Sequence, residues 1–560
     1  MMRRLSRRRA ASVLAAALLV PLAVQGQVRP DAGRTLEGIR PPPPPPPVEP
    51  AAVLPQQEKR PAMSGSDSKR IFVRHWRITG SRLYTEDQLE PLIHEFRGQK
   101  LTIDELNGVA ARITAYYRRQ GYLLSRAYIP AQDVRDNTVE IAVIEGHLAE
   151  ILVTNESPVA GSLITRYMER LRSTGPVEGH SLERSLLLLS DLPGVEVRST
   201  LMPGISVGTS DLDLHVRSTG RVNGSVDAGN TGNRYTGEYR GGATLNINSP
   251  FHYGDLLTLR ANTGGAGMSY GYGSWQTPLG GSGLKVGIAG SELQYRLRGQ
   301  FSSLEAHGNA NVLTARAAYP LIRSEYNNLL IQGSYDNKHL NDRIDTAAVD
   351  SHKTIGVWTL GLAGNQTDEF GGGGYNTYSL GIASGQLKLD AAAAAIDAGT
   401  GGHHTQGRYG KLFVSGSRTQ RLTDEVFLYS ALTGQWSTKN LDTSETLSLG
   451  GPSGVRAYPQ DEGAGDDAAL LTVELGWRVP DLPSAQTIAF ADAGAVRLNH
   501  SPLPTDTKNR RLLAGEGFGV RWRGANTFTL DAYLAWRSGP QPLSDVDRRP
   551  RAWVQFVQYF

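Results

Sequence analysis

Residues 472–479 read TVELGWRV, a stretch in which polar and apolar residues alternate. Successive side chains of a β-strand point to opposite faces, so Val473 and its alternate neighbours would line one face while Glu474 and its alternates line the other. Residues 243–248 and 257–262 follow the same pattern. Such strands suit a sheet with lipid on one side and water on the other, although a soluble β-sandwich gives the same alternation.

The N-terminus has the pattern of a secretory signal peptide over residues 1–26. Five arginines lie within residues 3–9, an apolar run follows at 10–22, and Val-Gln-Gly at 24–26 offers a cleavage site. The apolar run is shorter than the roughly 20 residues that a transmembrane helix needs. No later segment approaches that length. A membrane-inserted form would therefore be a closed β-barrel, which leaves no backbone group unpaired in lipid.

Three features favour the membrane barrel over the sandwich: the signal peptide, the glutamates and arginines on the non-apolar face of the strands, and the aromatic C-terminal residue. About 340 residues remain after residue 217, and strands near 10 residues plus turns and outer loops predict roughly 14 to 18 strands. Since even numbers are expected, we predict a 16-stranded antiparallel transmembrane β-barrel at residues 218–560. We interpret four residues of its last strand as interfacial and lipid-facing aromatics, namely Trp553, Phe556, Tyr559 and Phe560.

The composition argues against several kinds of site. The formal net charge of +4 over 560 residues gives no large single-sign field that would indicate nucleic acid. The absence of cysteine fits an exported protein without disulfides and removes thiolate metal sites. His403 and His404 have no third ligand at suitable spacing, and the glycines at 371–374 lack the Lys-Ser/Thr of a phosphate-binding loop. We expect no metal and no cofactor, and no enzymatic activity because no nucleophile, base and orienting group assemble.

Two different segments follow the signal peptide. Residues 27–40 could form one or two helical turns with Leu36 and Ile39 on one side, a helix that is marginal in isolation. An unbroken proline run at 41–47 opens a Pro-rich linker that we place at residues 41–70. A polyproline helix is stiff and extended, so the linker would carry the preceding helix to a distant site. The alternative is a disordered leader.

Residues 71–217 have the pattern of two small α+β modules. In residues 71–146 a strand is followed by two helices, each preceded by a capping box, and then by two short strands. Residues 147–217 show a similar order, with helices expected at 163–171 and 182–192. The pattern predicts two modules of one kind ahead of the barrel.

Motifs in the modules and in the barrel resemble one family. Residues 71–153 resemble a polypeptide-transport-associated (POTRA) domain through the segments YRRQGY at 117–122, IPAQ at 129–132 and VEIAVIEG at 139–146. The region from Val226 is similar to the barrel of the ShlB/FhaC/HecB transporters of two-partner secretion (TpsB proteins), which are relatives of the BamA assembly proteins. The segments that carry this similarity are 227–232, 237–240, 248–255 and 319–323. The resemblance implies two POTRA domains, at 71–146 and 147–217, and a short plug helix at 27–40.

Two further motifs concern a loop and a strand. LGGPSGVRAY at 449–458 resembles the family's Val-Arg-Gly-Tyr loop motif, and FADAG at 490–494 resembles its Phe-x-Asp-x-Gly strand motif. In the family this loop folds back into the barrel, so the resemblance implies that Arg456 meets Asp492 on the inner wall in a pair required for transport. The supporting motif residues would be Val455, Tyr458, Phe490 and Gly494.

Strand geometry is consistent with this pair. Phe490, Asp492 and Gly494 share one face of a strand, which places an aromatic ring on one side of the carboxylate and a bare glycine on the other. A planar guanidinium can form two parallel hydrogen bonds with such a carboxylate. The alternative is that Arg456 and Asp492 are two of the scattered, solvated charges of a barrel lumen. Ala457 stands where the motif usually has glycine, and alanine disfavours positive φ.

The resemblance implies an outer-membrane pore with POTRA domains in the periplasm. These would recognise a large β-rich exoprotein, a TpsA-like haemolysin, adhesin or contact-dependent toxin, which then crosses the barrel unfolded and without ATP. The other implied partners are outer-membrane lipid and, during biogenesis, the barrel assembly machinery. One alternative is an outer-membrane protein insertase or assembly factor, which usually has more POTRA domains. Another is a passive porin, which would not need residues 71–217.

Overall fold

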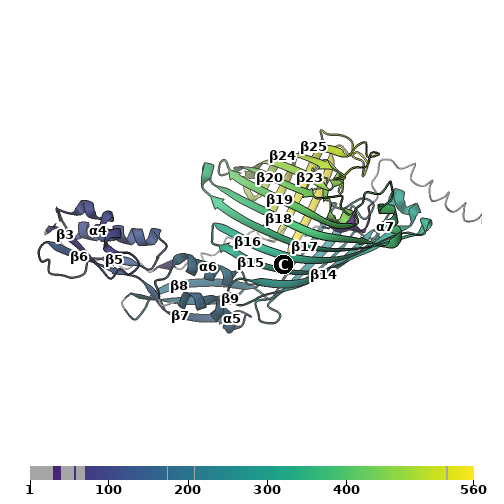
Figure 1. Ribbon diagram of the computed structural model, residues 1–560. Coiled ribbons are helices and arrows are strands. Elements are labelled where there is room, and N and C mark those ends of the chain that lie inside the picture. The colour runs from purple at the N-terminus through teal and green to yellow at the C-terminus, as the bar shows by residue number, and fades with distance from the viewer. Residues whose placement is uncertain (1–29, 40–55, 58–69, 173–174, 207, 525–526) are drawn as a thin grey trace, which may run out of the picture.

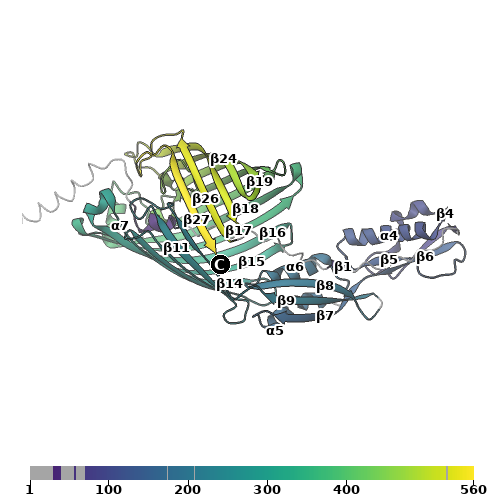
Figure 2. The same ribbon diagram turned by 180° about the vertical axis from the view of Figure 1, so that it is seen from behind.

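The computed structural model describes residues 30–39, 56–57, 70–172, 175–206, 208–524 and 527–560. The expected signal peptide at 1–26 lies outside the described residues, and so does the expected linker at 41–70 except for residues 56, 57 and 70. Two modules extend from one end of a barrel (Figure 1, and from behind in Figure 2). We call this end the module end and the opposite one the far end.

The first module comprises β2 (Ile71–Val73), β3 (His75–Thr79), α3 (Glu86–Leu89), η1 (Glu90–Leu92), η2 (His94–Phe96), β4 (Gln99–Leu101), α4 (Ile103–Arg119), β5 (Arg126–Tyr128) and β6 (Thr138–Ile144). Its main sheet has the order β3-β6-β5, and β2 pairs with β4. A capping box begins α4, because the backbone N–H of Glu105 donates to Oγ1 of Thr102 at 3.2 Å and that of Thr102 donates to Oε2 of Glu105 at 2.8 Å. The buried face of α4 includes Ile113 and Tyr117, which belong to the core of the module.

The second module comprises β7 (His147–Glu156), α5 (Gly161–Met168), η3 (Glu169–Arg172), α6 (Gly179–Ser190), β8 (Val195–Pro203) and β9 (Thr209–Ser218). The sheet order is β8-β9-β7, and the two-residue strand β1 (Gln56–Gln57) adds to β8 in parallel. The helices lie two to three residues before the expected ranges 163–171 and 182–192. None of the described helices is long and apolar enough to cross a membrane.

Polar contacts attach the second module to the module end of the barrel. Arg323 donates from Nε and Nη2 to both carboxylate oxygens of Asp191, at 2.8 and 2.7 Å. The backbone N–H of Ala160 donates to the carbonyl of His252 at 2.9 Å. The module therefore meets the barrel at separate places on the wall, which include the turn at residues 249–255 and the end of β15 at Arg323.

The barrel is closed by sixteen antiparallel strands. They are β10 (Val222–Gly229), β11 (Arg240–Asn248), β12 (Leu256–Thr263), β13 (Met268–Pro278), β14 (Lys285–Arg296), β15 (Ala306–Arg323), β16 (Asn327–Ile344), β17 (Val349–Asp368), β18 (Gly374–Leu389), β19 (Gly407–Arg421), β20 (Val426–Ser437), β23 (Asp467–Val479), β24 (Leu482–Arg497), β25 (Arg510–Gly524), β26 (Phe528–Arg537) and β27 (Arg551–Tyr559). This confirms the predicted strand number. The connections contain η4 (Gly299–Leu304), η5 (Asp345–Ala347), η6 (Phe370–Gly372), α7 (Ala391–Asp397), η7 (Thr443–Glu445), β21 (Leu447–Ser448) and β22 (Ala464–Gly465).

The alternation along β23 separates an outer face from an inner one. Leu475 is 51% exposed on the outer surface, whereas Glu474 is 1% exposed and lies inside. An apolar outside and a polar inside suit a barrel that is surrounded by lipid.

A short helix, α2 (Ala32–Glu37), lies inside the barrel and is visible through the wall in Figure 2. Asp31 caps it by accepting from the backbone N–H of Arg34 at 2.9 Å. The backbone N–H of Ala32 donates to Oδ1 of Asp342 on β16 at 2.8 Å, and Nη1 of Arg240 donates to the carbonyl of Gly38 at 2.8 Å. Both ends of the helix are thus bound to the barrel wall.

Candidate functional site

The connection between β20 and β23, residues 438–466, folds back into the barrel. We call it the return loop. Leu449, Val455 and Tyr458 are fully buried and pack against Phe490 and Leu513 of the wall. An apolar cluster inside a polar lumen fixes the position of the loop, because moving the loop would expose these side chains to water.

Arg456 forms three hydrogen bonds with Asp492. Its Nε donates to Oδ2 at 2.8 Å, its Nη2 donates to Oδ1 at 2.8 Å, and its backbone N–H donates to Oδ2 at 3.1 Å. Arg456 is 3% exposed and Asp492 is 2% exposed. The structure brings the two expected partners together in the bidentate geometry that makes such pairs strong and directional.

Glu474 is a second acidic partner of Arg456, and the sequence reasoning did not identify it. Nη1 of Arg456 donates to its Oε1 at 2.7 Å. Arg521 binds the same carboxylate, with Nη1 at 2.7 Å from Oε2 and Nη2 at 2.9 Å from Oε1. Asp492, Arg456, Glu474 and Arg521 therefore form a chain of alternating charges whose sum is zero. The alternation of residues 472–479 could have identified Glu474, because it places this side chain on the inner face of the strand.

Aromatic rings cover the guanidinium of Arg456. Its Cζ lies 3.5 Å from the ring centroid of Phe490 and 5.2 Å from that of Tyr533. The two rings meet edge to face, with centroids 6.1 Å apart. A desolvated cation over an aromatic face gains cation–π attraction, and the rings limit the access of water to the ion pair.

The other motif residues shape the space around the pair. A Cβ at Gly494 would lie 3.0 Å from Cδ1 of Leu449 and 3.3 Å from Cγ2 of Val455, so the bare glycine leaves room for the return loop. Tyr458 donates its hydroxyl to the carbonyl of Pro540 at 2.8 Å. Ala457 does not adopt positive φ. Its methyl would be 2.4 Å from a Cβ at Gly515, so the wall accommodates alanine by placing glycine opposite.

The interpretation as a lipid-facing residue was wrong for Trp553, and Tyr559 shares its face of β27 by the same parity. Trp553 is buried inside, and its Nε1 donates to the carbonyl of Arg456 at 2.7 Å. Val554 and Phe556 are exposed on the opposite face of β27. The period of two in a strand therefore requires Trp553 to point inward, where it holds the backbone of the arginine.

Helix α2 rests on the return loop. Oγ1 of Thr443 donates to Oδ2 of Asp31 at 2.7 Å. Nζ of Lys353 lies 2.9 Å from Oδ2 of Asp442 and 3.8 Å from Oδ2 of Asp31. A Cβ at Gly33 would be 2.7 Å from the backbone nitrogen of Ser444, so the contact is close. The helix and the loop obstruct the lumen together.

A cavity of about 750 Å³ remains between Gly38 and Ile39, which follow α2, the return loop and the wall. Its charged lining residues are Arg240, Arg260, Arg456, Arg478, Arg521, Arg523, Asp227, Glu474 and Asp531. Around these charges the wall is rich in hydroxyl and amide side chains such as Thr433 and Gln555. The cavity therefore offers both charged and uncharged polar contacts, beside apolar side chains such as Phe427 and Leu470.

Comparisons with known proteins match both the barrel and the first module. Residues 208–522 match the model of the family described as haemolysin secretion/activation protein ShlB/FhaC/HecB, and residues 71–146 match that of the ShlB-type POTRA domain. The chain is 26% identical over 490 residues to the heme/hemopexin transporter protein HuxB of Haemophilus influenzae (strain 86-028NP), covering 85% of this chain and 84% of that protein.

Two solved structures share the fold over their whole length. CdiB from Escherichia coli has a TM-score of 0.71 at 20% identity, with 100% of both chains covered. CdiB from Acinetobacter baumannii has a TM-score of 0.61 at 18% identity, again with 100% of both chains covered. Because the family match spans more than half of the sequence, the chain belongs to the haemolysin secretion/activation protein family ShlB/FhaC/HecB, the outer-membrane transporters of two-partner secretion.

Proposed function

We propose that this chain exports one large β-rich exoprotein, which enters the barrel unfolded at the module end and leaves at the far end without ATP. In this arrangement the module end faces the periplasm and the far end faces the cell surface. The observation that carries the proposal is a polar lumen obstructed by two internal segments, α2 and the return loop, with two soluble modules at one entrance. A helix of six residues is marginal on its own, so α2 depends on its contacts with the wall and the return loop, and passage of cargo requires these contacts to break.

The modules offer strand edges to an unfolded chain. Along the described residues β7 pairs with β9 on one side only, and Leu152 and Val153 are exposed on it. At the opposite edge of the sheet, β1 covers only two residues of β8. An extended segment of a β-rich cargo can add to such edges through main-chain hydrogen bonds, and side-chain pockets can select it.

The buried pair Arg456–Asp492 is the residue-level part of the proposal. We assign it a role in transport, in which the return loop must be held in one defined place and released or shifted for the cargo. Its supporting residues are Val455, Tyr458, Phe490 and Gly494, whose contacts are described above. The driving force would come from folding of the cargo outside, where burial and backbone pairing make return unfavourable.

The alternatives fit less well. A passive porin needs an unobstructed lumen and no modules, whereas this lumen contains α2 and the return loop. An insertase or assembly factor would not require a second segment tethered inside its pore, and its substrate would be folded into the membrane rather than released.

Proteoliposomes test the proposal without other cell components. The exoprotein partner, sought first in the neighbouring open reading frame, is supplied in urea-diluted, unfolded form to vesicles that contain the chain and no nucleotide. We expect the exoprotein to become protected from external protease when the modules face outward. The matched chain lacking residues 71–146 should give no protection. Protection that depends on added ATP, or that is equal without the module, would contradict the proposal.

A further inference from the structure

The barrel closes where its first and last strands meet, and this seam has the shortest ladder in the barrel. β10 and β27 pair over five residues each, Ser225 to Gly229 with Gln555 to Tyr559. By comparison, β10 pairs with β11 over eight residues and β16 with β17 over eighteen. A ladder of five pairs has few hydrogen bonds to resist local opening.

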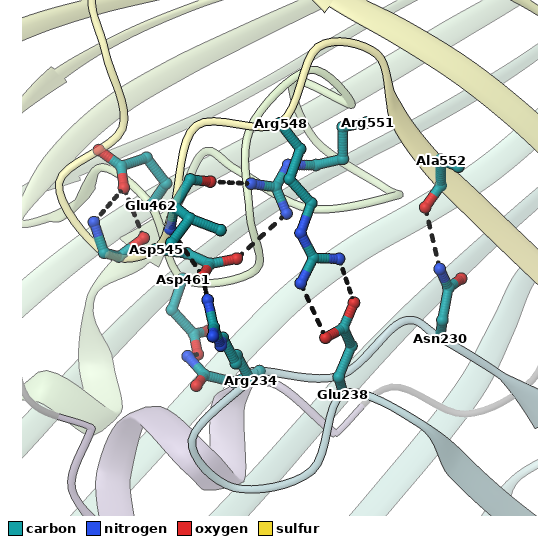
Figure 3. A network of polar contacts seen from close by, with 12 residues as sticks. Asn230, Arg234, Glu238, Asp461, Glu462, Asp545, Arg548, Arg551 and Ala552 are labelled. Atoms are coloured by element: carbon teal, nitrogen blue, oxygen red, sulfur yellow. Dashed lines mark hydrogen bonds and ion pairs between the residues drawn. The ribbon is translucent and has the colours of Figure 1, made fainter. Parts of the chain in front are cut away.

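Side chains extend the seam beyond the backbone ladder toward the far end. Nδ2 of Asn230 donates to the carbonyl of Ala552 at 2.9 Å, and its Oδ1 accepts from the backbone N–H of Val554 at 2.7 Å. Further out, Arg548 binds Glu238 with both terminal nitrogens, and the Nη2 to Oε2 distance is 3.0 Å (Figure 3). These contacts join the loop after β10 to β27 itself and to the loop before it.

The return loop connects the same two loops. Oδ2 of Asp461 accepts from Nδ2 of Asn233 at 2.9 Å, on the side of β10. Glu462, whose side chain is 0% exposed, accepts from the backbone N–H of Ser544 at 2.8 Å and of Leu543 at 3.0 Å, on the side of β27. A buried carboxylate that accepts several hydrogen bonds is a firm attachment point.

A further ion pair joins the loop after β10 to the loop before β27. Nη1 of Arg234, in the loop after β10, lies 3.2 Å from Oδ1 of Asp545, in the loop before β27. Asp545 also pairs with Arg551, the first residue of β27, at 3.3 Å. We call the whole set the outer clamp, formed by Asn230, Asn233, Arg234, Glu238, Asp461, Glu462, Asp545 and Arg548. Figure 3 labels all of these residues except Asn233.

We infer that the outer clamp keeps the seam between β10 and β27 shut while cargo passes along the barrel axis. The inference rests on the proposed function, because it assumes axial passage. Glu238 and Arg548 act in it as positioning residues: they touch no cargo, and they fix the far end of the weakest ladder. The contacts of Asn230, Arg234–Asp545 and Glu238–Arg548 do not involve the return loop, so they remain when the loop shifts for the cargo. Asp461 and Glu462 add to the clamp while the loop is in place.

Hydrogen exchange of the purified full-length chain measures seam opening directly. In Glu238→Gln and in Arg548→Gln, peptides that cover β10 and β27 should exchange up to about fivefold faster than in the unchanged chain, because one half of a partly exposed charged pair is lost. The double variant should exchange no faster than either single one, as expected for residues that act as a pair. Unchanged exchange in β10 and β27 in both single variants would overturn the inference.

Arg343→Gln is the matched control. Arg343 pairs with Asp350 at 3.1 Å near the far end, between the long-paired strands β16 and β17. Its loss should leave exchange at the seam unchanged. If exchange in β10 and β27 rose equally in this variant, loss of any charge at the far end would explain the result. That outcome would overturn the inference.

An engineered disulfide separates seam closure from transport. Gly224 and Phe560 exchange both backbone hydrogen bonds, at 3.0 and 3.1 Å, so Ser225 and Tyr559 form the adjacent non-hydrogen-bonded pair, whose side chains approach most closely. The chain contains no cysteine, so Ser225→Cys with Tyr559→Cys gives one possible bridge. When oxidised in the Arg548→Gln background, it should return exchange at the seam to the rate of the unchanged chain.

The same bridge should leave export of the exoprotein at its normal level. If the oxidised barrel stops exporting and reduction restores export, the seam must open for transport and the inference is overturned. Failure of the proposed function would look different, because the chain without any substitution would then export no exoprotein.

Discussion

Arg456–Asp492 and Arg548–Glu238 are both pairs of a guanidinium and a carboxylate, one inside the barrel and one in the outer clamp, but the two pairs differ in burial. Inside the barrel the side chains of Arg456 and Asp492 are 4% and 0% exposed, whereas in the outer clamp those of Arg548 and Glu238 are 36% and 22% exposed. Water and salt weaken the outer attraction, and the inner charges depend on each other because little water reaches them. Similar geometry therefore predicts unequal consequences when one partner is removed.

The largest effect is expected for Arg456→Ala. It strands the carboxylates of Asp492 and Glu474 in a buried site, which typically costs about 3–5 kcal/mol when solvent is well excluded. We expect the barrel still to reach the outer membrane in heat-modifiable form while exporting little exoprotein. Gel mobility with and without heating, and exoprotein in the medium, measure the two properties.

Further variants separate the pair from general lumen charge. Asp492→Ala should match Arg456→Ala, and the double variant should be no worse than either. Arg456→Lys keeps the charge and loses the planar fork, so it should restore little export. Arg523→Ala is a control, because Arg523 also faces the lumen and pairs with Asp531 at 2.5 Å. Normal export by Arg456→Ala, or losses that simply add, would favour the solvated-charge alternative.

Deletion of residues 30–39 removes the helix that lies against the return loop and leaves both attachment sites of the loop intact. Single-channel conductance in planar bilayers should rise, and export should be largely retained, because the contacts of Arg456 do not involve α2. Thr443→Val, which loses only the hydrogen bond to Asp31 at 2.7 Å, should give a smaller rise. Unchanged conductance after deletion would rule out α2 as a plug.

The smallest loss of stability is expected for Arg548→Gln, and its dependence on salt distinguishes the outer pair from the inner one. Arg548→Gln should lower the stability of the barrel by about 1 kcal/mol or less at low salt, and this loss should shrink at 1 M salt, where the Debye length is about 3 Å. The loss caused by Arg456→Gln should change little with salt. The temperature at which the barrel loses its heat-modifiable mobility measures both. An equal salt response at the two places would show that the inner pair is solvated.

The alternating stretches predicted the barrel only together with the signal-peptide pattern, the charges on the non-apolar face and the aromatic C-terminal residue. The motifs were sufficient to place Arg456 next to Asp492. The same alternation placed Glu474 inside, but it did not reveal which inward residue meets which, because that depends on the stagger of strands around the barrel. Trp553 was misread because aromatic type was given more weight than strand parity. Helices α5 and α6 began earlier than expected, since Ala160 and Glu178 provide no side-chain cap to mark their starts.

The outer clamp and the wall contacts of α2 could not be derived from sequence, although the resemblance implied a plug helix within residues 27–40. Glu238 and Arg548 are 310 residues apart, and both lie in loops without a periodic pattern. A stiff proline run indicates how far a preceding helix can reach, but it does not indicate the wall residues, such as Asp342 and Arg240, that bind it. Contacts of this kind depend on closure of the whole barrel.

The neutral chain formed by Asp492, Arg456, Glu474 and Arg521 has a consequence for ion permeation. If the return loop moves, it takes the positive charge of Arg456 with it, while the three other groups stay in the wall. Two carboxylates and one guanidinium then face the pore, so the wall acquires a net negative charge at that level. An ion passing these three side chains would meet a negative potential that is absent when the loop is in place. Cations would therefore be favoured over anions. The state of the loop would therefore be readable as a change in the reversal potential across a salt gradient.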